Sequence, residues 1–210
     1  MTSKVVLLPA IAAFLGGLGG WAVITVEDLP DYLVAGEPVS LTFTVRQHGV
    51  RPLEALTPTI EARSGSLRER VAATPGREAG QYTASLAVPQ AGSWTVTIHS
   101  GFLSSTTTLV PLEAVAASSR SLPELAETER GRRLFVAKGC ATCHLHGVVG
   151  PDLAGVRVPP DFLKQFLANP AILAAASHQA FPMPNLHLKA GEIDALVAYL
   201  TAETPAAPAR

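Results

Sequence analysis

From Trp21 to about Pro111, apolar and polar residues alternate along the chain. Segment 38–46, PVSLTFTVR, is the clearest case, since Val, Leu, Phe and Val take one side and Ser, Thr, Thr and Arg the other. A period of two is typical of strands with one buried face. The pattern predicts strands at 21–27, 38–46, 58–63, 67–73, 80–88, 93–100 and 105–110.

Turn-forming residues separate the predicted strands, in the stretches AGEP, RSG, TPGREAG and PQAG. Short strands at this spacing, with no helical stretch among them, predict an antiparallel β-sandwich of the immunoglobulin-like type. The region has no cysteine, so it lacks the disulfide that joins the two sheets of antibody domains.

The hydrophobic pattern changes in the C-terminal half. Apolar residues there recur every three or four positions, which predicts amphipathic helices at 125–139, 160–170 and 190–203. We therefore expect two domains of different class, joined by a linker of small and polar residues. The predicted N-terminal segment, β-domain, linker, helical domain and tail are residues 1–20, 21–111, 112–124, 125–203 and 204–210.

The N-terminal segment is apolar, because Lys4 is the only charged residue before Glu27. Residues 5–18 have the length of a signal-peptide core, and the whole uncharged run is long enough to span a membrane. Since residues 21–27 predict a strand, a cleaved export signal is favoured over a retained anchor. In both cases the protein is expected to be exported, as a periplasmic or secreted protein.

Charge adds little to this picture. With a formal net charge of −1, the chain gives no reason to expect a nucleic acid as partner. Four basic residues precede the cysteines, and they predict either a solvated helix face or a patch that steers an acidic redox partner. These residues are Arg130, Arg132, Arg133 and Lys138.

The two cysteines, Cys140 and Cys143, are followed at once by His144. A thioredoxin-like pair would need a βαβ setting, which is absent, and a structural zinc site would need further ligands at a fixed spacing. A disulfide would leave the histidine unexplained. Cys-x-x-Cys-His is the attachment signature of c-type haem, with the thiols spaced for the two vinyl groups and the histidine beneath the iron. Zinc and a disulfide remain the alternatives.

With this motif in place, residues 125–203 resemble a class I cytochrome c domain. GRRLF at 131–135 resembles the N-terminal helix of that family, and LVAYL at 196–200 resembles the C-terminal helix on which it packs, with Tyr199 in the aromatic place. The resemblance implies the all-α class I cytochrome c fold and one covalently bound haem c.

The resemblance also implies further site residues. GPDLAG resembles the loop whose proline carbonyl accepts a hydrogen bond from the proximal histidine, so Pro151 would orient His144. Met183, in a proline-bounded loop before the last helix, is the expected distal ligand. Its competitors are His178 and His187, and a histidine there would lower the reduction potential.

The predicted β-domain has no comparable site. His48 and His99 are isolated in the sequence, and the domain lacks the cysteine and methionine of a cupredoxin centre, although a weak copper site at His48 stays open. Segments 36–49 and 92–101 loosely resemble exported domains of the FixH and YtkA type, which implies no settled activity. We interpret this domain as a docking or spacing module that the haem chemistry does not require.

The sequence thus predicts a periplasmic electron-transfer protein with one covalent c-type haem and His/Met axial ligation, and not an enzyme. Its expected partners are a donor and an acceptor redox protein. The alternative is a cytochrome c subunit of a larger membrane oxidase or dehydrogenase complex. A haem sensor or peroxidase, which needs an open sixth position, is the third hypothesis.

Overall fold

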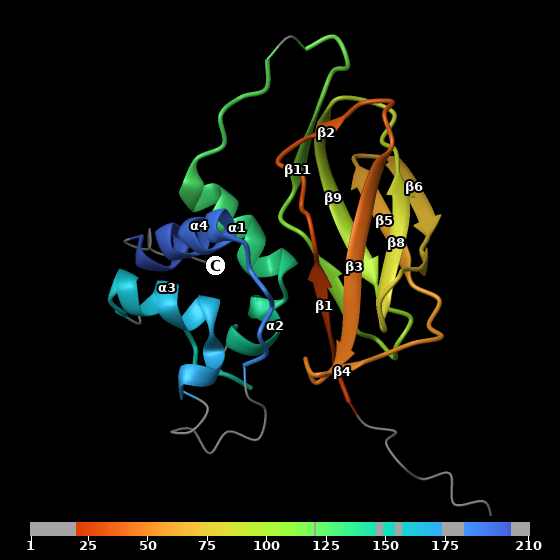
Figure 1. The fold of residues 1–210 in the computed structure, drawn as a ribbon. Helices are drawn as coiled ribbons and strands as arrows, with labels where there is room; N and C mark the ends of the chain where they lie inside the picture. Colours follow the sequence, from red (N-terminus) through yellow and green to blue (C-terminus); the bar gives the residue numbers. More distant parts are fainter. Residues whose placement is uncertain (1–19, 120, 146–148, 154–156, 174–182, 203–210) are drawn as a thin grey trace, which may run out of the picture.

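A computed structural model describes residues 20–119, 121–145, 149–153, 157–173 and 183–202. Two β-sheets stand on one side of the molecule and the helices lie together beside them (Figure 1). The strands are β1 (Ala22–Val26), β2 (Leu33–Val34), β3 (Val39–Gln47), β4 (Arg51–Pro52), β5 (Thr59–Ser64), β6 (Leu67–Ala72), β7 (Thr74–Pro75), β8 (Gln81–Leu86), β9 (Gly92–His99), β10 (Thr106–Thr108) and β11 (Leu112–Val115).

The strands pair in two sheets. One has the order β1-β3-β8-β7, with β4 beside β3, and the other has the order β2-β11-β9-β5-β6, with β10 beside β9. Among the described strands, β2 and β11 pair in parallel and the other pairs are antiparallel. We call these strands and their turns, residues 21–115, the two-sheet region.

The alternation read from the sequence is confirmed in the core of the two-sheet region. Each predicted strand segment contains an observed strand, and the apolar faces of both sheets meet in one buried cluster. Phe43 of β3 stacks on Tyr82 of β8, and Trp94 of β9 is completely buried in the same cluster. Residues 112–115 fall in the predicted linker but form β11, which pairs with β9 and β2.

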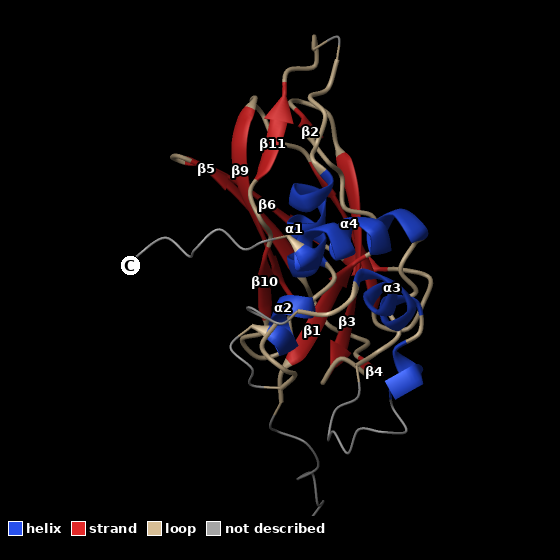
Figure 2. Cartoon of the chain, turned by 90° about the vertical axis from the view of Figure 1, so that its left-hand side faces the viewer, coloured by secondary structure: helices blue, strands red, loops and turns tan. Residues whose placement is uncertain are grey.

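Strand β1 differs from the others because both of its faces are buried. Ile24 and Val26 point into the core between the sheets, whereas Val23 and Thr25 lie on the other face and are also buried. The helices cover this second face, and in the view from the helical side they lie in front of the strands (Figure 2). A continuous apolar run, AVITV, is what a strand buried on both faces requires.

The helices are short. They are α1 (Glu127–Ala137), α2 (Cys140–His144), α3 (Pro160–Ala168) and α4 (Ala190–Thr201), with a 3-10 turn at Pro170–Leu173. Three of them fall in the predicted helical segments, and α2, which carries the cysteines, does not. None of the described helices has the length and apolar character needed to cross a membrane.

Helices α1 and α4 pack closely where Gly131 meets Ala195. A Cβ on Gly131 would lie 1.9 Å from the Ala195 carbonyl oxygen, so only glycine allows this approach. One turn further along, the rings of Phe135 and Tyr199 lie 5.6 Å apart in a tilted arrangement. This crossing is the centre of the helical core.

The expected fold class, an immunoglobulin-like sandwich joined to an all-α class I cytochrome c fold, is wrong. The described chain has four α-helices beside many strands in two sheets, and its C-terminal region is not a class I all-α cytochrome fold. The physical reason is that the helices, besides their own core cluster, also pack on the strands. Ala137, at the end of α1, is buried in the core cluster of the two-sheet region. The helical periodicity is informative locally, but it carries no information about this shared packing.

Candidate functional site

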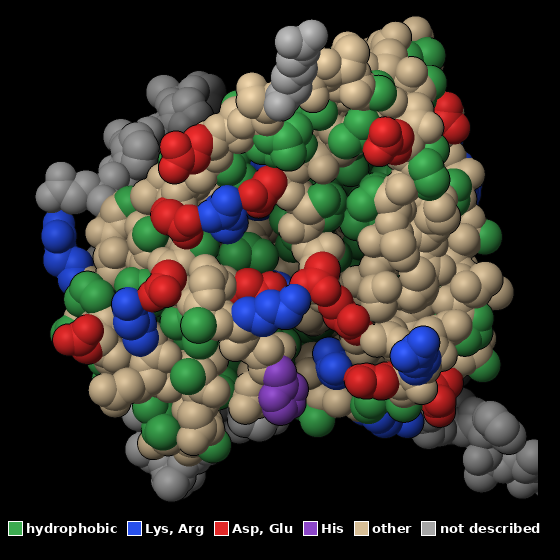
Figure 3. All heavy atoms as spheres, turned by 45° about the horizontal axis from the view of Figure 1, so that its top comes forward, with side chains coloured by type: hydrophobic (Ala, Val, Ile, Leu, Met, Phe, Trp, Pro, Cys, Tyr) green, Lys and Arg blue, Asp and Glu red, His purple; other side chains and the backbone are tan. Residues whose placement is uncertain are grey.

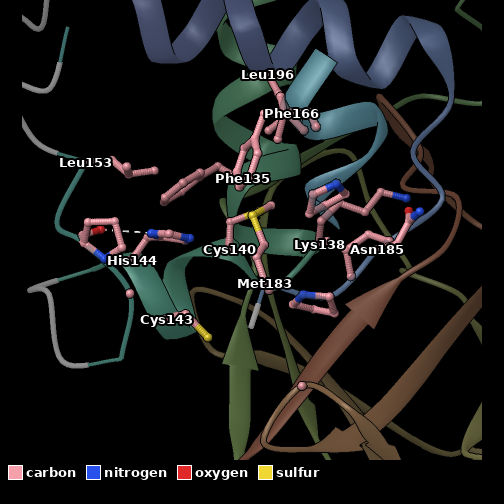
Figure 4. Close-up of a pocket in the computed structure, with 18 of the residues that line it drawn as sticks. Phe135, Lys138, Cys140, Cys143, His144, Leu153, Phe166, Met183, Asn185 and Leu196 are labelled. Atoms are coloured by element: carbon pink, nitrogen blue, oxygen red, sulfur yellow. Dashed lines mark hydrogen bonds between the residues drawn. The ribbon is translucent and has the colours of Figure 1, made fainter. Parts of the chain in front are cut away.

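An apolar cavity of about 510 Å³ lies between the helices and the edge of the two-sheet region (Figure 4). Its size falls in the range of small-molecule and cofactor sites. Aromatic and aliphatic side chains make up most of the helical side of its lining, among them Phe135, Leu153, Phe162, Leu163, Phe166, Leu196 and Leu200. Such a lining suits a large, flat, mostly apolar group.

Cys140 and Cys143 both line this cavity from α2. They stand three positions apart on one helix and therefore face the same side, and they form no disulfide. Gly139, with a φ of 80°, ends α1 and turns the chain into α2. This turn brings the cysteines to the cavity.

The two thiols sit in apolar surroundings. Burial raises the pKa of Cys140 to about 12 and also raises the pKa of Cys143. Apolar surroundings disfavour the thiolate, which is the reactive form of a redox cysteine. Within the described part of the chain, no three His, Cys, Asp or Glu side chains gather as a metal-binding group. The described residues thus offer no support for the zinc alternative.

His144 is oriented as its sequence context predicts. Its Nδ1 donates a hydrogen bond of 2.9 Å to the carbonyl oxygen of Pro151, drawn as the dashed line in Figure 4. Because a carbonyl oxygen can only accept, Nδ1 carries a proton, and in the neutral ring the lone pair is therefore on Nε2. The ring is thus prepared to bind a metal ion through Nε2.

Gly150 allows this arrangement, although the sequence analysis assigns a role in the GPDLAG loop only to Pro151. A Cβ at this position would lie 2.8 Å from Cε1 of His144, so the imidazole packs against bare backbone. The Gly150 amide also donates a 2.9 Å hydrogen bond to the Cys143 carbonyl oxygen. The loop therefore folds back on the helix that carries both thiols.

Met183 lines the same cavity, half-buried against the helical core, just before α4. His187 is exposed and is not among the lining residues, and its backbone amide bonds to the Asn185 side chain. His178, the other competitor, lies outside the described residues. The structure thus brings the five predicted site residues together, namely Cys140, Cys143, His144, Pro151 and Met183.

The four basic residues before the cysteines form no open patch, and of the four only Arg132 and, in part, Arg130 face solvent. Arg130 pairs with Asp31 and Arg132 pairs with Glu129. Arg133 and Lys138 are buried, at 7 % and 5 % exposure, so both predictions are wrong for them. On the face drawn in Figure 3, basic side chains stand beside acidic ones, with no continuous basic patch there.

The comparisons with known proteins concern the helical region. The family model described as cytochrome c oxidase, cbb3-type, subunit III matches residues 126–200. No curated protein matches the chain. The matched residues contain the described helices and all five site residues, while every described strand lies outside them. The match supports a c-type cytochrome domain in the C-terminal part of the chain, with covalently bound c-type haem and a role in electron transfer.

Proposed function

We propose that this protein is an exported electron-transfer protein that carries one c-type haem in the apolar cavity. The observation that carries the proposal is the convergence of two thiols, an oriented imidazole and a thioether on one cavity of suitable size. The described residues fit the group, since the lining is apolar and the donor set is that of a His/Met haem protein.

Each residue has its own part in holding the group. Cys140 and Cys143 supply the two sulfurs for the covalent bonds, and His144 supplies the proximal nitrogen. The Pro151 carbonyl oxygen accepts a hydrogen bond from Nδ1 of His144, which fixes the tautomer and the ring orientation. Met183 supplies the distal sulfur. When bound, the haem supplies a one-electron ferric/ferrous couple.

The remaining lining residues keep water away from the group. Phe135, Phe166 and Leu196 surround the cavity in Figure 4, and burial of this kind is one of the levers that set a reduction potential. A haem held by both His144 and Met183 would need little rearrangement when its oxidation state changes. This arrangement favours an electron carrier over a sensor or peroxidase, which needs an open position.

A second form of the proposal places the chain in a membrane complex. The matched family is described as a subunit of a cbb3-type cytochrome c oxidase. The chain would then pass electrons to the catalytic subunit of such an oxidase and would not itself be catalytic. Export, with the helical region on the periplasmic side, belongs to both forms.

The test is the covalent link itself. The protein is produced in a host that attaches c-type haem, extracted with acid and acetone, and weighed by mass spectrometry. We expect the colour to stay with the chain and the mass to rise by one haem. Cys140→Ala combined with Cys143→Ala should abolish both results, whereas Thr142→Ala, an exposed residue between them, should leave both unchanged.

Two results would contradict the proposal. The first is a haem that extracts freely from the wild-type protein, and the second is a purified protein that contains zinc and no haem. To separate the two forms of the proposal, the chain is purified from its native membranes. Oxidase subunits that remain bound in mild detergent support the complex, and a chain recovered alone supports the free carrier.

A further inference from the structure

The two-sheet region contributes directly to the cavity. Val23 of β1 and the turn residues His48 and Gly49 line it together with the helical side chains. These residues come from the region that the sequence assigns to a separate domain. The sequence around them does not predict that they line the haem cavity. Their position raises the question of what holds the two regions together at this point.

Val23 is the centre of the contact. It is 5 % exposed, yet it does not belong to the core between the sheets. A Cβ on Gly139 would lie 2.4 Å from Cγ1 of Val23 and 2.9 Å from the Ile24 carbonyl oxygen. The residue next to Cys140 therefore rests directly on β1, without space for a side chain.

The charged side chain of Lys138 stabilises the contact between β1 and the helices. Its ammonium group lines the cavity, donates a 2.6 Å hydrogen bond to the Glu27 carbonyl oxygen, and pairs at 2.7 Å with the Glu192 carboxylate of α4. The Thr25 hydroxyl donates a 3.4 Å hydrogen bond to the Lys138 carbonyl oxygen. This cation bonds to both regions, and their separation would break its hydrogen bond to the Glu27 carbonyl, which as a bond to a charged group is stronger than a neutral one.

The segment that carries Met183 rests on the same surface. A Cβ on Gly49 would lie 3.5 Å from Cγ2 of Val23 and 3.7 Å from Cγ of Pro184, so this turn packs between β1 and the Met183 segment. Further along, Lys189 forms an ion pair with Asp28, just after β1. The two-sheet region therefore touches segment 183–189, which carries Met183, near its start at Pro184 and at its end at Lys189.

We propose that the two-sheet region is one wall of the haem cavity, which keeps water out and holds Met183 in its ligating position. This inference rests on the proposed function and assigns the β1 edge and the 48–49 turn a positioning role. The region is then part of the redox site, and not only a docking or spacing module.

The main test is Val23→Asn, with Val23→Thr as the milder variant of nearly the same shape. A polar side chain in the wall admits water, which stabilises the more highly charged ferric state. We expect a lower reduction potential and faster carbon monoxide binding to the reduced protein, with the smaller change for Val23→Thr. Val115→Thr, in β11 and away from the cavity, is the matched control and should change neither.

A second measurement follows unfolding instead of redox behaviour. Heating is monitored by tryptophan fluorescence, which comes from Trp21 and Trp94 of the two-sheet region, and by the absorbance of the haem. In the wild-type protein the two transitions should coincide, and in Lys138→Met they should separate, with the haem signal changing at lower temperature. Lys164→Met, which removes an exposed pair with Asp194, should keep them together.

The outcomes are distinguishable. A wild-type protein without covalent haem overturns the proposed function. If Val23→Asn carries haem but has an unchanged potential and unchanged carbon monoxide binding, the proposed role of the two-sheet region is wrong while the proposed function stands. Separate unfolding transitions in the wild-type protein would contradict that role in the same way.

Discussion

At the scale of single residues, the site depends on how neighbouring groups limit one side chain. Nδ1 of His144 bonds to the Pro151 carbonyl oxygen, and the ring packs against the backbone of Gly150. Together these contacts fix the direction in which Nε2 points. Residue type and spacing predict Cys140, Cys143 and His144, and the resemblance to class I cytochromes c adds Pro151 and Met183. The structure places all five at one cavity. The sequence does not predict Gly150, Val23 or Lys138, whose roles depend on what packs against them.

Met183 is expected to be the distal ligand, and Met183→Ala tests this. Loss of the thioether should remove the weak near-infrared charge-transfer band of the ferric protein and lower the potential, because the thioether favours the ferrous state. The open position should also bind carbon monoxide readily. His187→Ala is the control, since this side chain is exposed and away from the cavity. If His187→Ala removes the band and Met183→Ala keeps it, the ligand assignment is wrong.

The thiols of the haem-free chain give a prediction that depends on pH. Burial raises the pKa of Cys140 to about 12, so the reactive thiolate is scarce at neutral pH and increases as pH rises. Alkylation of Cys140 by iodoacetamide at pH 8 should be roughly tenfold or more slower than that of an exposed cysteine, even after allowing for the greater nucleophilicity of a basic thiolate. The rate should climb steadily toward high pH. Rapid alkylation at pH 8 would show that the cavity does not form before haem is bound.

At the scale of elements, hydrophobic periodicity predicts most of the strands and three of the helices. It fails for α2 and for strands β2, β4, β7 and β11, which are too short to show a period and are defined by their neighbours. A period of two does not show that β1 is covered on its second face. The run AVITV, which lacks a clear alternation, is what indicates burial on both faces. Local pattern therefore predicts the elements, and the fold class depends on contacts between them.

The crossing of α1 and α4 gives the element-scale prediction. In Gly131→Ala the new methyl group would lie 1.9 Å from a carbonyl oxygen, so the helices must move apart. Overpacking of this kind costs about 1–3 kcal/mol, and denaturant unfolding should show a loss of that size. Gly191→Ala, at an open position on α4, is the control and should be neutral or slightly stabilising. Equal stability of the two variants would contradict the close crossing.

At the scale of the whole molecule, the two regions act as one structure. The sequence predicts a helical domain that holds haem without the β-domain, and the observed contacts argue for the reverse. Without the two-sheet region, Lys138 loses the Glu27 carbonyl, Arg133 loses the Asp31 carbonyl, and Ala137 loses its buried surroundings. A hydrogen bond to a charged group contributes about 1.5–3 kcal/mol, so losing two of them is a large share of the stability of a small domain.

The fragment 119–210, given its own export signal, should therefore accumulate poorly and retain little haem. Its circular dichroism should show no cooperative thermal transition, whereas the full chain should show one. The fragment 20–115 is the comparison, because it contains every buried residue of the core between the sheets except Ala137. A fragment 119–210 with full haem content and an unchanged potential would show that the interface is dispensable.

The carboxylate of Glu192 has a consequence for how this sequence can change over time. One of its oxygens accepts the backbone amide of Lys189 at 2.9 Å and so caps α4, while the other pairs with the buried Lys138. A neutral residue at 138 or at 192 leaves the charge of the other residue without this partner. A substitution of Glu192 also removes the acceptor at the start of α4. Positions 138 and 192 are therefore expected to vary together among related chains, so that a neutral residue at one is accompanied by a neutral residue at the other.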